Sequence, residues 1–139
     1  MSPALADTPK LLDAPVLVDT SIWIDHLRSA NTELVARLER GEVWGHAFIV
    51  GELACGNLTN RREILRRLEA LPQADVAEHW EVLAFLEAHS LSGRGIGWVD
   101  AHLLASARLS RLPLWTLDRQ LAAVAREIGL APATSSESP

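Results

Sequence analysis

The first sustained apolar run of the chain is Val16-Leu17-Val18, which follows Pro15 and ends at Asp19. A short continuous run of this kind is typical of a strand buried on both faces of a parallel sheet. Residues 21–28 then carry apolar side chains at helical spacing, which predicts a helix directly after the strand. Because ligands of parallel sheets bind at the carboxyl ends of the strands, the pattern makes Asp19 the first candidate site residue.

The alternation of short apolar runs and helical patterns continues along the chain. A second helix is expected to begin at Asn31 or Thr32 and to end before Gly41. Further strands are expected at 42–45 and 114–117, with a weak edge strand at 72–76, and further helices at 47–58, 61–70, 77–89, 98–112 and 120–128. Strands that alternate with helices indicate an α/β fold, here a three-layer domain whose central sheet is mostly parallel and flanked by helices.

The length of 139 residues suits a single domain. Residues 1–13 are expected to be a loose lead-in, residues 14–131 the folded domain, and residues 132–139 a disordered tail. No apolar run has the length of a membrane span, and the N-terminus lacks a signal pattern, so we expect a cytoplasmic protein. Cys55 is the only cysteine, which excludes an intramolecular disulfide and a multi-cysteine zinc site.

The net charge of −5 argues, at face value, against a polyanionic partner. However, Lys10 is the only lysine, so nearly all of the positive charge is arginine, which is suited to bidentate phosphate contacts. Acids that converge on a divalent cation would also have their charge offset locally. Candidate phosphate contacts lie in the helix at 61–70, although a solvated helix face is an equally good interpretation; they are Arg61, Arg62, Arg66 and Arg67.

Four acids stand apart from the others because of where they lie in the pattern. Asp19 and Asp118 each follow a predicted strand, Asp100 opens a helix behind a glycine-rich loop, and Glu52 lies in a mostly apolar run. Carboxylates gathered at one sheet edge would repel one another unless cations were present, and such oxygen ligands suit Mg²⁺ or Mn²⁺. The alternative is three helix caps and one surface glutamate that are unrelated in space.

Four blocks around these acids resemble the signature of the PIN-domain ribonucleases. They are Val-Asp19-Thr-Ser-Ile-Trp, Gly-Glu52-Leu-Ala-Cys-Gly, Gly-Ile-Gly-Trp-Val-Asp100-Ala-His-Leu-Leu-Ala-Ser-Ala and Trp-Thr-Leu-Asp118-Arg-Gln-Leu. Within that superfamily the chain is most similar to the VapC toxins of type II toxin–antitoxin pairs, over roughly residues 16–130. All four blocks occur in the expected order, which is more specific than any one of them.

The resemblance implies a metal-dependent endoribonuclease toxin that hydrolyses RNA phosphodiester bonds. It implies that Asp19, Glu52, Asp100 and Asp118 hold Mg²⁺ or Mn²⁺. Ser21 and Thr116 are candidates for hydroxyls that hold the carboxylates in place. The resemblance further implies an RNA substrate, a VapB-like antitoxin, a homodimer and a toxin–antitoxin hetero-oligomer.

Two histidines depart from the family pattern. His102 replaces a usually apolar residue and is expected at the surface, and His46 replaces a small or hydroxyl residue.

Other phosphate chemistries fit the sequence less well. A haloacid-dehalogenase phosphatase needs Asp-x-Asp, whereas Thr20-Ser21 follow Asp19, and a receiver domain needs a lysine near its acids. No Walker A sequence or Gly-x-Ser-x-Gly elbow is present. A non-catalytic module, whose acid pocket only binds an arginine of a partner, stays open as the second hypothesis.

Overall fold

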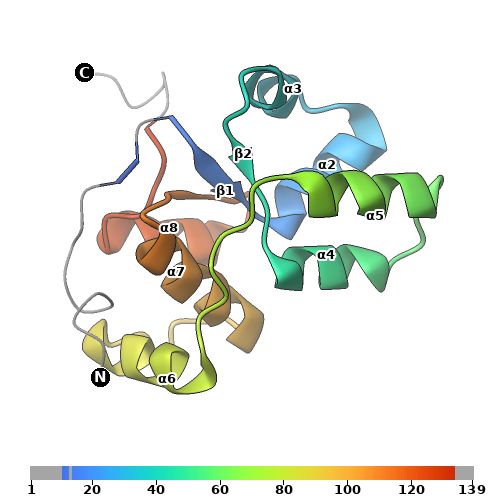
Figure 1. The fold of residues 1–139 in the computed structure, drawn as a ribbon. Helices are drawn as coiled ribbons and strands as arrows, with labels where there is room; N and C mark the ends of the chain where they lie inside the picture. The colour runs from blue at the N-terminus through green and yellow to red at the C-terminus, as the bar shows by residue number, and fades with distance from the viewer. Residues whose placement is uncertain (1–10, 13, 134–139) are drawn as a thin grey trace.

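A central parallel sheet organises the molecule. The computed structural model describes residues 11, 12 and 14–133, so most of the predicted lead-in and tail lies outside the described residues. The strands β1 (Val16–Val18), β2 (Val43–Trp44) and β3 (Leu114–Trp115) are all parallel, in the order β2-β1-β3 (Figure 1). The middle strand β1 is completely buried, as its unbroken apolar run predicts, and the predicted α/β class with a parallel sheet is confirmed.

Helices fill the connections between the strands and cover the sheet. In Figure 1, α2 to α5 gather on one side of the sheet and α6 to α8 on the other. Their bounds are α2 Thr20–Ser29, α3 Thr32–Glu39, α4 Ala47–Ala54, α5 Arg61–Ala70, α6 His79–Ala88, α7 Trp98–Ser110 and α8 Arg119–Glu127. None of these helices has the length and apolar character that a bilayer crossing requires, within the ranges that the structure describes.

Helix α7 is the central helix of the core. Every residue from Ala101 to Arg108 is buried, which is expected for a helix surrounded by protein on all sides. Arg108 is accommodated there because its Nη2 donates a hydrogen bond to the carbonyl of Ile128, at the end of α8. A cation at this position also interacts favourably with the negative end of the α8 dipole. The core therefore fixes both α7 and α8 relative to β3.

The weak edge strand predicted at 72–76 is reduced to a single parallel bridge. Only one bridge forms there, between Gly45 and Gln73. Beyond it, the backbone is bound by α7 instead of by a strand: Ser110 Oγ accepts from the Asp75 amide at 2.9 Å, and Ser106 Oγ accepts from the Ala77 amide at 3.1 Å. Side-chain acceptors from a helix thus replace the ladder partners that a strand would have needed.

Two elements end earlier than predicted. Helix α4 stops at Ala54 rather than near residue 58, because the guanidinium of Arg61 donates to the carbonyls of Ala54 and Gly56 and so satisfies the end of the helix. Strand β3 stops at Trp115, since the next residue, Thr116, turns its hydroxyl toward β1. The second difference brings a hydroxyl to Asp19, at the carboxyl end of β1.

Candidate active site

Asp19 lies at the carboxyl end of β1 and is the most enclosed of the four acids. Its side chain is only 6% exposed, and it caps the N-terminus of α2. Its Oδ2 accepts hydrogen bonds from the hydroxyls of Ser21 at 2.8 Å and of Thr116 at 2.7 Å. These are the two hydroxyls that the sequence suggested, and they fix the orientation of the carboxylate.

The same two hydroxyls connect Asp19 to the segment that carries Asp118. Thr116 Oγ1 accepts from the Asp118 amide at 3.0 Å, and Ser21 Oγ accepts from the Leu117 amide at 2.9 Å. Asp118 itself caps α8, where its Oδ1 accepts from the Leu121 amide at 3.0 Å. The ends of β1 and β3 are therefore joined by side chains as well as by the sheet.

Glu52 reaches the site from α4. It is exposed, and its Oε1 accepts a 2.7 Å hydrogen bond from the hydroxyl of Thr20, the residue that follows Asp19. Sequence reasoning missed Thr20, although a hydroxyl directly after the first acid was a usable signal. Through this contact the acid of α4 is tied to the start of α2.

Asp100 lies in the first turn of α7, where its Oδ2 accepts from the Gly97 amide at 3.0 Å. Burial raises the pKa of this carboxyl, and the negative charges of Asp19 and Asp118 raise it further, while the Gly97 N–H acts in the opposite direction. Repulsion of this kind requires the three aspartates to lie near one another. Asp19 and Asp118 are helix caps, as the alternative interpretation held, and Asp100 binds the amide of the cap residue Gly97, but the three are not unrelated in space.

Each of the four carboxylates is held through one oxygen. Among the described residues, the hydrogen bonds to these side chains fall on Asp19 Oδ2, Glu52 Oε1, Asp100 Oδ2 and Asp118 Oδ1, and the second oxygen of each receives none. Carboxylate oxygens are the ligands that Mg²⁺ and Mn²⁺ prefer, so the donor set fits such an ion. Within the described ranges, however, no three His, Cys, Asp or Glu side chains already stand close enough to enclose a metal.

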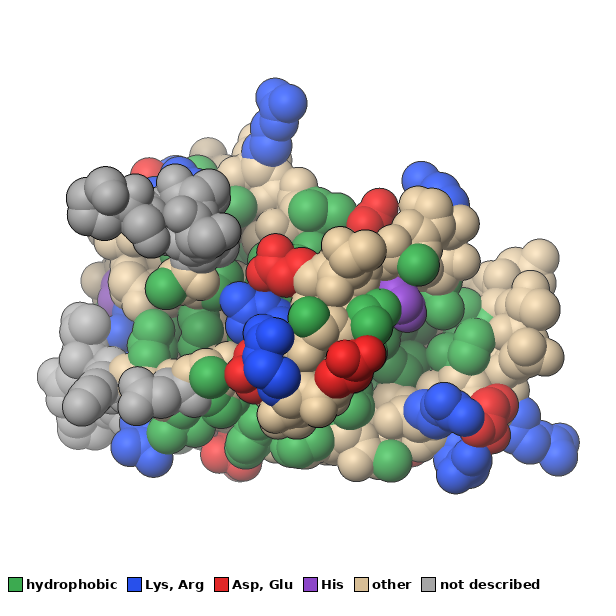
Figure 2. All heavy atoms as spheres, turned by 90° about the horizontal axis from the view of Figure 1, so that it is seen from above, with side chains coloured by type: hydrophobic (Ala, Val, Ile, Leu, Met, Phe, Trp, Pro, Cys, Tyr) green, Lys and Arg blue, Asp and Glu red, His purple; other side chains and the backbone are tan. Residues whose placement is uncertain are grey.

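The arginines of α5 are exposed but largely occupied. Arg66 and Arg67 each lie 2.7 Å from Glu63, and their hydrogen bonds lower the pKa of that carboxyl to about 2. Arg61 donates to the carbonyls at the end of α4. Among the four α5 arginines, only Arg62 has no side-chain hydrogen bond or ion pair within the described part of the chain. On the face drawn in Figure 2, acidic side chains also lie next to basic ones.

The expected surface position of His102 is wrong. His102 is 5% exposed and His46 is fully buried, and both rings pack against Phe48, with centroids 4.5 and 5.3 Å from it. His46 Nδ1 accepts from the Phe48 amide at 2.9 Å, and its Nε2 lies 2.9 Å from Ser106 Oγ. Burial lowers the pKa of His46 to about 4, with a smaller contribution from His102. The imidazole of His46 is consequently neutral and structural.

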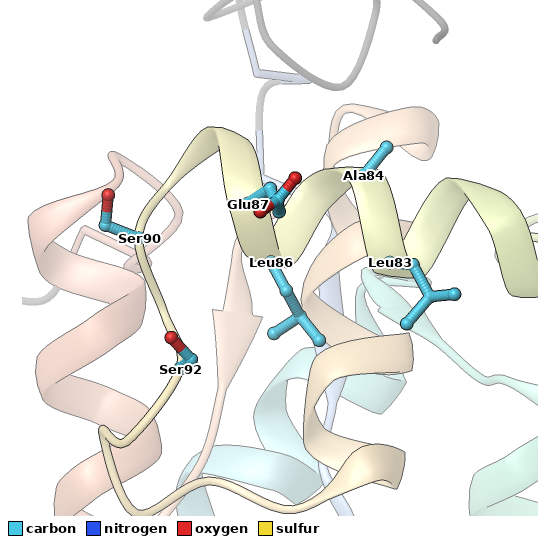
Figure 3. Close-up of a pocket in the computed structure, with 6 residues that line it drawn as sticks. All are labelled: Leu83, Ala84, Leu86, Glu87, Ser90 and Ser92. Atoms are coloured by element: carbon cyan, nitrogen blue, oxygen red, sulfur yellow. The ribbon is translucent and has the colours of Figure 1, made fainter.

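Two surface hollows lie away from the four acids. One, of about 590 Å³, lies at the end of α6 and contains a single carboxylate; Figure 3 shows Leu83, Ala84, Leu86, Glu87, Ser90 and Ser92 around it. The other, of about 350 Å³, is mostly apolar and lies between α2, α3 and α5; it is lined by Trp23, His26, Leu27, Leu38, Ile64, Arg67, Leu68 and Leu71. Neither offers the converging oxygens of the sheet edge, so the acid site is the candidate for chemistry.

Comparison with known proteins agrees with this geometry. The model of the PIN domain family matches residues 16–127, which include all four acids. The chain is 44% identical over 112 residues to the curated Ribonuclease VapC32 of Mycobacterium tuberculosis, in strains CDC 1551 / Oshkosh and ATCC 25618 / H37Rv. The alignment covers 80% of this chain and 90% of the relative. The chain therefore belongs to the PIN domain family and is a ribonuclease toxin of the VapC type.

Proposed function

We propose that this ribonuclease is an endonuclease that depends on Mg²⁺ or Mn²⁺, and that Asp19, Glu52, Asp100 and Asp118 hold the ion. The observation that carries the proposal is that the two oxygens of each carboxylate have different surroundings. One oxygen is fixed by a hydroxyl or an amide of the protein, and the other has no hydrogen bond within the described part of the chain. Acids that served only as caps would not need to share one edge of the sheet.

The residues of the chain then have distinct tasks. A bound divalent ion would polarise the phosphodiester and lower the pKa of a water molecule. No side-chain nucleophile is then needed. Asp19 is held rigidly by Ser21 and Thr116, whereas Glu52 is exposed and is held by Thr20 alone. The N-terminus of α7 presents its positive dipole end beside Asp100, which favours a phosphate there.

The direct test is cleavage of a labelled RNA by purified protein freed of any partner. Cleavage that requires Mn²⁺ or Mg²⁺ and stops with EDTA is the expected result. The second hypothesis, a non-catalytic module that binds a partner's arginine, predicts no cleavage with either metal. Cleavage that continues in EDTA would contradict the metal requirement while leaving the ribonuclease assignment intact.

We also propose that the α5 arginines Arg61, Arg62, Arg66 and Arg67 contact RNA phosphates. The helix packs beside α4, the helix that carries Glu52 (Figure 1). An RNA phosphate would have to displace Glu63 from Arg66 and Arg67, whereas Arg62 can bind a phosphate without the loss of an ion pair. RNA affinity should then fall with salt, and Arg62→Ala should reduce that salt dependence.

A VapB-like antitoxin is proposed as the inhibitor, with the apolar hollow between α2, α3 and α5 as its docking place. Two of the lining residues, Trp23 and Leu27, lie on α2. Trp23 follows Asp19, the N-cap of this helix, by about one turn. A bound segment that leaves this hollow along α2 would reach the four acids. Its arginine would pair with two carboxylates and take the place of the metal charge.

We further propose that the toxin forms a homodimer, alone and within a toxin–antitoxin hetero-oligomer, and acts in the cytoplasm, where its RNA substrates are. Large apolar side chains stay exposed on the described surface, among them Val76 at 46% and Leu83 at 47%, and an interface between two copies would cover such side chains. Sedimentation at micromolar concentration, without antitoxin, should show a dimer. A strictly monomeric species would contradict this assembly.

A further inference from the structure

Trp98 is an exposed aromatic residue that the acid site does not use. It is the first residue of α7, two positions before Asp100, and 40% of its surface is exposed. Its ring lies 5.1 Å from the exposed ring of His79, the first residue of α6, with the two planes at 53°. Two aromatic rings thus meet at the surface where α6 and α7 begin.

The pair is supported by two further rings, the buried His102 and the half-buried Phe48. Trp98 packs edge-on against His102, with centroids 4.8 Å apart, and His102 packs in turn on Phe48 at 4.5 Å. The Nδ1 of His102 is buried and has no hydrogen-bond partner among the described residues, so packing rather than hydrogen bonding holds this side of its ring. The indole of Trp98 therefore stands on a rigid row and loses little conformational freedom when a ligand binds it.

The position of His79 is also fixed. The Ala77 amide, two residues earlier, donates to Ser106 Oγ, which lies one turn after His102 on α7. The segment that leads into α6 is therefore tied to the helix that carries Trp98. Both rings of the pair are held by α7, and their relative placement follows from it.

The row of rings consists of Trp98, His102 and Phe48, and each of its two ends shares a helix with one of the four acids. Trp98 and Asp100 share the first turn of α7 but point to different sides, because two positions correspond to about 200° around a helix. Phe48, at the other end of the row, lies one turn before Glu52 on the same face of α4. A strand bound at the acids would therefore present the base of a neighbouring nucleotide, rather than the reacting one, to Trp98.

We propose that Trp98 and His79 form a stacking site for an unpaired base that flanks the cleaved phosphodiester. This inference rests on the ribonuclease function and adds a base-binding subsite to it. A base can stack on a protein ring only when it is free of its own helix, as in a single strand or a loop. Cleavage should accordingly depend on an unpaired base at one defined position beside the cut, which Trp98 receives.

The test uses a single-stranded RNA that the wild-type protein cleaves, together with copies that carry an abasic nucleotide at each position around the cut. Stacking on an aromatic side chain contributes about 1–3 kcal/mol per base, or roughly 5- to 150-fold. One flanking abasic position should lower kcat/KM of the wild type by that factor. Trp98→Ala should show the same loss on intact RNA and no further loss on that abasic copy, whereas Trp98→Phe should keep most of the activity.

Trp80→Ala is the matched control, because it removes an equally exposed indole that lies outside the row of rings and whose N–H donates to Glu78. Affinity for uncut RNA, measured in an Asp100→Asn background, gives a readout that does not depend on turnover. Melting curves and sedimentation check that fold and assembly are unchanged in each variant. Annealing the RNA to its complement should abolish cleavage by the wild type.

Three results would overturn the stacking site while leaving the ribonuclease function in place. They are equal losses in Trp98→Ala and Trp80→Ala, an abasic penalty that persists in Trp98→Ala, and full cleavage of the annealed duplex. Absence of cleavage by the wild type on every RNA would instead overturn the ribonuclease function itself.

Discussion

The hydroxyl of Thr116 donates a 2.7 Å hydrogen bond to Oδ2 of Asp19, across 97 positions of sequence. The same oxygen atom of Thr116 accepts from the Asp118 amide at 3.0 Å. One small side chain thus orients a carboxylate on β1 and the backbone of a second carboxylate after β3. The two acids are positioned together because they share this hydroxyl.

Removing that hydroxyl should loosen the acid site without abolishing it. Thr116→Val keeps the volume but leaves Asp19 with one hydroxyl partner, and we expect activity or metal affinity to fall roughly 10- to 100-fold. Stability should fall by about 0.5–1.5 kcal/mol, the net contribution of an ordinary hydrogen bond, because the exposed Asp118 amide exchanges its acceptor for water. Thr116→Ser is the matched control and should retain both. Unchanged Mn²⁺ affinity in the valine variant would show that Thr116 does not orient Asp19.

Neutralising an acid should separate activity from stability. Asp19→Asn and Asp100→Asn should each abolish cleavage, while stability without metal holds or rises, because repulsion among Asp19, Asp100 and Asp118 is relieved. In the wild type, Mn²⁺ at about 100 times its Kd should add about 2.7 kcal/mol of stability, read as a higher Tm. The asparagine variants should lose most of that increase. Wild-type rates in either variant would contradict the four-acid site.

Acid should destabilise the protein through His46. The unfolded imidazole has a pKa near 6.5, whereas burial lowers the folded value to about 4, so the unfolded state binds the proton more readily in this range. Stability is therefore lost as pH falls below about 6.5, by roughly 2 kcal/mol between about pH 7 and about pH 5.

His46→Asn tests this contribution, because the asparagine Oδ1 still accepts from the Phe48 amide at the start of α4. Unfolding in urea across the pH range should show a shallower pH dependence in the variant, whatever its absolute stability. Identical slopes in the two proteins would assign the acid sensitivity to other groups.

Inhibition by the antitoxin should compete with metal. If an antitoxin arginine occupies the acids, Mn²⁺ affinity should drop in the purified complex, and changing that arginine to alanine should restore it. The complex itself should persist, because the hollow lined by Trp23 and Leu27 supplies separate contact area. Metal affinity that is equal with and without antitoxin would show that the acid site stays open.

Elements with strong local signals were predicted well. Val16–Val18 is the buried centre of the sheet, and helix α5 has the predicted bounds, because Asn60 before it and Leu71-Pro72 after it mark both ends. The four acids were chosen for their positions relative to strands and helices, which periodicity reveals. Parallel strands account for Asp19 and Asp118 at one edge of the sheet, whereas Glu52 and Asp100 lie on helices whose placement the strands do not give.

The remaining features depend on partners that are distant in sequence. Residues 72–76 look like a strand locally, but beyond the single bridge to Gly45 the Asp75 amide is bound by Ser110 of α7. His102 reads as a surface residue because it is polar, whereas rings from α4 and α7 enclose it. Thr20 gains its role only when α4 brings Glu52 to it. No window of sequence contains both members of such pairs.

The order of the sheet has a consequence for synthesis of the toxin. β1 is made first, yet it is the middle strand and needs β3, whose residues Leu114–Trp115 are made only after α2 to α7. Until then one edge of β1 has no neighbour, and neither Thr116 nor Asp118 is present to complete the surroundings of Asp19. The acid site can therefore assemble only after Asp118 has emerged from the ribosome.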